Sequence, residues 1–217
     1  MSVAVDDGSG SKRAQILTVA TEHFGTVGYE HTKWASIADE VGIGQTALYH
    51  YFESKAHCLL TIMRIQLADS IERFRAGTAG IPDPVEAFGS AVASSLRGET
   101  VDVLQRRIVQ NQIVILGTPR RSDGEEAERV RSRELVAEIE SNWAHLIKRG
   151  MDAGDFVDGD AMLQARLVLG VLGSVWRWYR PGGPLSLNDV IRTVSDATMR
   201  MLSARQTDPA GPACPLC

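Results

Sequence analysis

The sequence has little of several features that mark particular classes of protein. Three cysteines in 217 residues exclude a disulfide-rich scaffold and fit a reducing compartment. A net charge of −4 argues against a generally basic nucleic-acid coat protein. The longest charge-free apolar stretch, residues 108–119, is far shorter than a membrane span. The first ten residues lack the cationic start and apolar centre of a signal peptide. We therefore expect a cytoplasmic protein that makes no membrane contact.

Patterns that mark catalysis or cofactor binding are also missing. The motifs G-x-G-x-x-G and G-x-S-x-G do not occur, and the five histidines show no spacing suited to a metal. Cys214 and Cys217 form a lone C-x-x-C pair, whereas zinc needs four ligands. Cys58 lies in an apolar helical pattern and is predicted to be buried packing. The sequence therefore predicts no catalytic residue, no cofactor and no metal.

Residues 32–55 contain two adjacent helical patterns. In the first, four apolar residues recur at the spacing of one helix face: Trp34, Ile37, Ala38 and Val41. Thr32 precedes this face and is the expected N-cap. Gly42 follows it, where the end of a helix favours a residue that adopts positive φ. The pattern predicts a short helix that ends in a tight turn.

The second pattern separates apolar from polar side chains on a short helix. One side would be buried: Ala47, Leu48, Tyr51 and Phe52. The other side would face outward: Gln45, Thr46, Tyr49 and His50. Exposed hydrogen-bonding side chains on the second helix of such a pair are typical of a protein that reads the DNA major groove.

This stretch resembles the DNA-binding head of the TetR family of transcriptional regulators. The similarity is densest in Ile37-Ala38, Val41-Gly42, residues 48–52 and Ser54-Lys55. It departs from the family pattern at Gly44, where a capping Ser or Thr is usual, and at residues 45–47, so the operator sequence stays open. The resemblance implies a non-enzymatic regulator that binds double-stranded DNA.

The expected DNA contacts divide into two kinds. We assign base reading to Gln45, Thr46 and Tyr49 at the start of the second helix. Gly44, directly before them, is also expected to contact DNA. We assign phosphate contacts to Thr32, Lys33, His50 and Lys55. Residues 1–60 hold four basic and seven acidic residues, a balance of −3. Affinity per monomer should therefore be modest, and we expect a homodimer on an inverted-repeat operator.

The rest of the chain predicts an all-α fold of about nine helices, because no strand-like alternation or internal repeat is present. We expect a three-helix helix-turn-helix head in residues 11–55 and a ligand-binding and dimerisation bundle in residues 56–205. Residues 1–10 and 206–217 are expected to be disordered tails. Helices outside the two short ones are predicted at residues 11–26, 54–76, 84–97, 100–116, 123–149, 161–179 and 186–204.

A ligand site in the bundle is predicted from two features. Residues 100–116 place Val101, Leu104, Ile108 and Ile115 at helical spacing, and Asn111 or Gln112 interrupts them. A buried amide would need a partner, which is either a ligand, the neighbouring backbone or solvent. Large aromatics either line a pocket or fill the core. The expected ligand-binding residues are Ile108, Asn111, Gln112, Ile115, Trp143, Trp176 and Tyr179.

A second resemblance lies in residues 178–185, W-Y-R-P-G-G-P-L. It is similar to the C-terminal domain of TetR-type repressors of steroid and fatty-acid breakdown that acyl-CoA thioesters release. It implies a small hydrophobic effector, with acyl-CoA as one class, and arginines for its phosphates: Arg106, Arg107, Arg120, Arg121, Arg177 and Arg180. The last two helices, with small residues such as Gly170 and Ser174, are expected to form the dimer seam. Two alternatives remain open: a TetR-type efflux regulator that senses drug-like compounds, and a helical scaffold or adaptor with a vestigial head.

Overall fold

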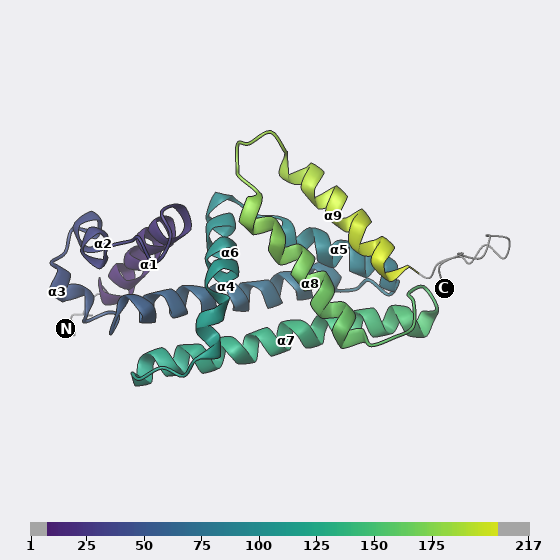
Figure 1. Ribbon diagram of the computed structural model, residues 1–217, viewed down its shortest axis with the longest axis horizontal. Helices are drawn as coiled ribbons and strands as arrows, with labels where there is room; N and C mark the ends of the chain where they lie inside the picture. The colour runs from purple at the N-terminus through teal and green to yellow at the C-terminus, as the bar shows by residue number, and fades with distance from the viewer. Residues whose placement is uncertain (1–7, 204–217) are drawn as a thin grey trace, which may run out of the picture.

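The computed structural model describes residues 8–203, which form nine α-helices and one 3-10 helix (Figure 1). The elements are α1 Gly8–Thr26, α2 Trp34–Val41, α3 Gln45–Leu48, α4 Lys55–Thr78, α5 Pro84–Leu96, α6 Thr100–Gln112, η1 Ile113–Gly117, α7 Asp123–Ala153, α8 Ala161–Trp178 and α9 Leu187–Leu202. Within this range the only β-type pairing is an isolated bridge between Phe156 and Ser203. The all-α prediction is confirmed. The predicted tail 206–217, with its two cysteines, lies outside the described residues.

The helices form a small head and a larger body joined by α4. Helices α1 to α3 make the head, and α4 runs from it along the body beside α7 (Figure 1). Helix α6 packs against both α1 and α4, so it touches head and body at once. Helix α8 covers α6 and α7, and α9 packs on α5 and α8. Within residues 8–203, no helix combines the length and apolar character needed to cross a membrane.

Most predicted helix starts are confirmed by side-chain caps. The hydroxyl oxygen of Ser54 accepts a hydrogen bond from the His57 backbone N–H at 3.0 Å and starts α4. The carboxylate of Asp83 does the same for α5, with a proline at its first position. Asp160 caps α8 and Ser186 caps α9. These caps satisfy N–H groups that have no partner inside the helix.

Three predicted boundaries are wrong. Helix α1 begins at Gly8, so residues 8–10 belong to it and not to a tail. Helix α6 ends at Gln112, where the tighter η1 takes over. Helix α7 passes through Gly150 and ends at Ala153, and Gly154 caps it with a left-handed φ of 81°. Gly150 does not end the helix; its missing side chain makes room for the ring of Phe156.

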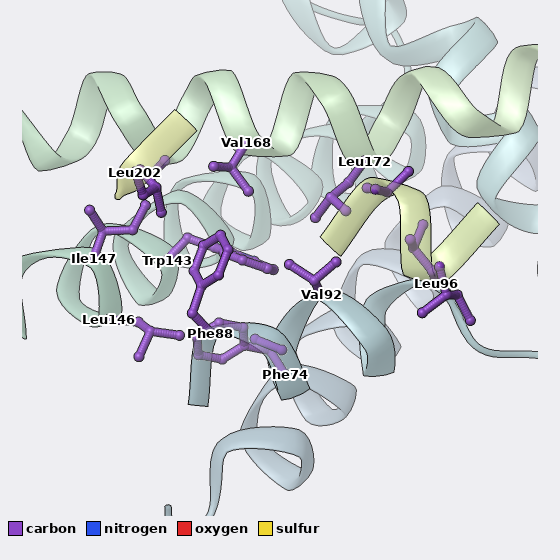
Figure 2. Packing of buried hydrophobic residues seen from close by; sticks show 14 of the residues in the cluster. Phe74, Phe88, Val92, Leu96, Trp143, Leu146, Ile147, Val168, Leu172 and Leu202 are labelled. Carbon is purple, nitrogen blue, oxygen red and sulfur yellow. The ribbon is translucent and has the colours of Figure 1, made fainter. Parts of the chain in front are cut away.

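Two large apolar clusters hold the molecule together. In the body, the Trp143 ring lies 5.2 Å from that of Phe74 and 5.7 Å from that of Phe88, and side chains of α8 such as Leu172 approach it from the other side (Figure 2). The second cluster is centred on the head. It also contains Ile108 of α6 and Leu116 of η1, which lie far from the head helices in the sequence. Residues of the body therefore complete the core of the head.

Candidate functional site

The helix-turn-helix forms as the sequence predicts. The four apolar residues of α2 are buried, and Gly42 turns the chain with a φ of 74°. Helix α3 then buries Leu48, and Phe52 just beyond it is also buried. Ala47 and Tyr51, predicted to be buried, are half-buried. The side chains predicted to face outward are exposed: Gln45, Thr46, Tyr49 and His50. One polar surface therefore faces away from the head, as groove reading requires.

The prediction that Thr32 caps α2 is wrong. Lys33 is the capping position, and it makes no side-chain cap. Thr32 is only 4% exposed, and its hydroxyl donates to the Gly28 carbonyl at 2.8 Å. Its side chain is therefore bonded within the connection between α1 and α2 and is almost fully buried.

Lys55 also has a structural contact that the sequence did not reveal. Its ammonium donates to the carbonyls of Tyr29 and Thr32 at 2.8 and 3.0 Å. It also lies 4.2 Å from the centre of the Tyr29 ring, a cation–π distance. The start of α4 is thereby tied to the α1–α2 connection. Lys33, directly before α2, and His50, two residues after the end of α3, are both exposed.

Two substitutions on this surface should have different effects. Gln45→Ala should lose discrimination at one base pair of each half-site, roughly 1–3 kcal/mol, because glutamine can pair bidentately with adenine. Lys33→Ala should weaken all sequences alike and reduce the salt dependence by about one charge per subunit. Binding to a set of single-base operator variants, measured at several salt concentrations, separates the two effects. An unchanged base preference in Gln45→Ala would remove its reading role.

A cavity of about 240 Å³ lies in the body between α4, α6, α7 and α8. Its apolar wall includes Leu67, Val109, Trp143, Leu172 and Trp176. Polar side chains line it from four helices, α4, α5, α6 and α7, among them Gln66, Ser70 and Arg106. An apolar hollow with a few polar groups is the usual form of a small-molecule site.

Only some of the predicted ligand-binding residues line the cavity. Trp143 and Trp176 line the cavity, and Ile108, Asn111, Gln112, Ile115 and Tyr179 do not. Asn111 is exposed and so does not interrupt a buried face. Ile108 is buried in the head cluster, and Val101 is 43% exposed. Helix α6 is thus rotated relative to the prediction, and Arg106, Val109 and Gln110 face the cavity at i, i+3 and i+4.

Arg106 is a buried cation in the cavity wall. It donates to the carbonyls of Leu96 and Arg97 at 3.0 and 2.6 Å, and its guanidinium lies 4.8 Å from the centre of the Trp176 ring. Burial, followed by repulsion from Arg73, lowers the pKa of Arg106 to about 10. It therefore stays protonated at neutral pH, fixed against the ends of α5 and α8.

Arg107, the next residue, joins the head to the body. Its guanidinium donates to the Gly25 carbonyl at the end of α1, at 3.2 Å. It also donates to the carbonyls of Trp176 and Tyr179 at the end of α8, at 3.2 and 2.9 Å. Helix α6 therefore places one arginine in the cavity wall and the next one between α1 and α8.

A second, more open hollow adjoins the cavity. It lies between η1 and α7, and it shares Val136 and Glu140 with the cavity wall. Arg133 lines it, and Glu140 pairs with Arg166 at 2.9 Å. One arginine, Arg133, therefore lies in the hollow, and Arg166 pairs with the carboxylate of the wall that the hollow and the cavity share.

Comparison with known proteins gives family matches for both the head and the body. The sequence model "Bacterial regulatory proteins, tetR family" matches residues 16–62, and "Tetracyclin repressor-like, C-terminal domain" matches residues 99–202. The chain belongs to the TetR family. It is a DNA-binding transcriptional repressor of the TetR type, in a family of regulators and not of enzymes, and its partner is operator DNA.

Individual relatives extend over most of the chain. HTH-type transcriptional repressor KstR2 of Mycobacterium tuberculosis is 28% identical over 188 residues, 83% of this chain and 87% of that protein. The structure of ketosteroid transcriptional regulator KstR2 of the same organism matches with a TM-score of 0.75 at 24% identity, covering 88% of this chain and 95% of that one. AibR, solved with isovaleryl coenzyme A and operator DNA, matches with a TM-score of 0.69 at 19% identity, covering 88% and 98%. At these identities the two structural matches establish the fold alone.

Proposed function

We propose that this TetR-family repressor is a homodimer that leaves an inverted-repeat operator when a hydrophobic acyl thioester enters the body cavity. The observation that carries this proposal is the position of α6. Its residues Arg106 and Val109 form the cavity wall, and Arg107 and Ile108 contact the head. A ligand that displaces α6 therefore displaces the base of the DNA-binding head.

The division of labour follows the sequence prediction. Residues 11–55 form the DNA-binding head, residues 56–205 form the ligand-binding and dimerisation part, and both act in the cytoplasm, where an operator is reached. Two recognition helices must lie about 34 Å apart to enter successive major grooves. Helix α4 begins in the head and carries the cavity residues Gln66 and Leu67 further along. A ligand that favours a shifted α4 or α6 would disturb that spacing by population shift.

The effector class is inferred from three observations together. The cavity is mostly apolar and smaller than the roughly 300–1,000 Å³ of sites for drug-sized ligands, which suits a compact acyl group. The adjoining hollow is lined by Arg133, a suitable partner for the phosphates of a coenzyme A outside the cavity. One structural relative was solved with isovaleryl coenzyme A. Of the other arginines predicted for this role, Arg107 and Arg180 donate to backbone carbonyls, and Arg120 pairs with Glu125.

The test is release of operator DNA by defined esters. The protein would be bound to the DNA that flanks its own gene and titrated with acyl-CoA esters of increasing chain length and with the free acids. One ester should release DNA and raise the Tm of the free protein. If no ester changes either quantity and a drug-like compound does, the effector assignment fails and a drug-sensing regulator takes its place.

Arg107 should couple the two ends of this mechanism. Arg107→Gln removes the charged bridge between α1 and α8, so the ester should still bind the free protein. The parent protein should bind the ester more weakly when operator is bound, because coupling between two sites is reciprocal. In Arg107→Gln this difference in ester affinity should shrink about tenfold. Arg177→Gln, at an exposed arginine of α8, is the matched control. Unchanged coupling in Arg107→Gln would show that the signal takes another route.

A further inference from the structure

One polar atom in the cavity wall has no partner. Gln66 lies on α4, and its side chain is only 2% exposed. Its side-chain nitrogen donates to the Ser70 hydroxyl at 3.2 Å. Its side-chain oxygen, Oε1, is buried without a hydrogen-bond partner among residues 8–203.

The neighbouring hydroxyl fixes the orientation of this amide. Ser70 donates its single hydroxyl proton to the Gln66 backbone carbonyl at 2.9 Å. Its oxygen can then only accept a further hydrogen bond, so the Gln66 group beside it must be the NH₂. The atom left without a partner is therefore the carbonyl oxygen, an acceptor on a residue that lines the cavity.

No donor of residues 8–203 bonds this acceptor. Arg106, the arginine of the cavity wall, bonds instead to the carbonyls of Leu96 and Arg97. Leu67 and Trp143 contribute apolar surface to the same cavity. A buried acceptor left unpaired destabilises a protein, and such atoms are rare in native structures. A ligand that brings a donor to this atom removes that penalty when it binds.

We propose that Gln66 is a specificity residue that accepts a hydrogen bond from a hydroxyl group on the acyl chain of the effector. The inference rests on the proposed function and narrows its ligand class to hydroxyacyl thioesters. A saturated chain leaves Gln66 Oε1 unpaired. A keto group at the same carbon sets an acceptor against an acceptor, which is unfavourable. The cavity should therefore rank hydroxy above saturated, and saturated above keto.

The experiment uses matched coenzyme A esters and the full-length protein. Hexanoyl-CoA would be compared with its forms hydroxylated at carbon 3, 4, 5 or 6 and with the corresponding keto forms, by titration calorimetry. At least one hydroxy ester should bind about tenfold more tightly than hexanoyl-CoA. Gln66→Leu should abolish that preference by weakening only the hydroxy ester.

Two further variants control for folding and for position. Gln66→Met repeats the test with a flexible apolar side chain, in case leucine packs poorly. Gln164→Leu is the matched control, since Gln164 also has a buried, unpartnered Oε1 and does not line the cavity. It should keep the hydroxy preference intact.

The possible failures are distinguishable. If saturated and hydroxy esters bind equally, or a keto ester binds best, the inference falls and the acyl thioester proposal stands. If the hydroxy preference survives in both Gln66 variants, another residue reads the hydroxyl and the inference also falls. If no coenzyme A ester binds at all, both proposals are overturned.

Discussion

Gly150→Ala is expected to unfold about 4–10 °C below the parent protein, a loss of about 2–3 kcal/mol from overpacking. The substitution would normally favour a helix, because alanine is a better helix former than glycine. Here the added methyl group would overlap the ring of Phe156, which is itself buried and packed edge-on against Phe88 at 5.7 Å. Because Phe156 is only 3% exposed, its ring cannot shift without displacing its neighbours.

Gly89→Ala is the matched control for this prediction. Gly89 lies inside α5, and an added methyl group there would meet nothing within 4 Å. The same chemical change should therefore raise stability by up to about 1 kcal/mol. Thermal unfolding followed by circular dichroism gives both values. Equal shifts in the two variants would mean that Phe156 is not held against α7.

Leu167→Glu is expected to convert the proposed dimer to monomers and to weaken operator binding roughly 100- to 10,000-fold. Leu163 and Leu167 of α8 are 55% and 52% exposed in the single chain, and Gly170, Ser174 and Trp178 continue the same helix face. Such a surface is rarely left in water, and small residues on it allow a second copy to approach closely. A glutamate at its centre would leave a charge buried without a partner.

Sedimentation and operator titration test this prediction together. Val130→Glu adds the same charge at an exposed apolar position of α7 and should leave both measurements unchanged. Point substitutions test the interface more specifically than removal of α9 would. Val190 and Val194 of α9 are part of the body core, so their loss would also disturb folding. A Leu167→Glu protein that stays dimeric would place the interface on another face.

Local signals predicted the head and most helix ends, and longer-range packing decided the rest. Capping residues such as Ser54 and Asp83 act within a few positions, so their roles follow from the sequence alone. The glycine at position 150 accommodates the ring of Phe156, and Lys55 bonds to carbonyls more than twenty residues earlier. No local pattern contains either contact.

The cavity was predicted only in part for the same reason. Trp143 and Trp176 were found because large aromatics are few, although the sequence could not separate core from cavity wall. The rotation of α6 was missed because the head takes up Ile108, which the helical spacing alone assigned to the body. Gln66 had no signal at all, since its importance lies in a missing hydrogen bond.

The shared core has a consequence for recombination among regulators of this fold. Ile108 and Leu116 come from the body but complete the apolar interior of the head, together with Leu59, Met63 and other residues of α4. A head excised after residue 55 would expose that interior to water. A head fused to the body of another regulator would pack against side chains of a different shape. Functional chimeras should therefore require the recipient body to supply matching side chains at these two positions. The transferable unit is the head together with the body residues that complete its core, and no single cut in the chain isolates it.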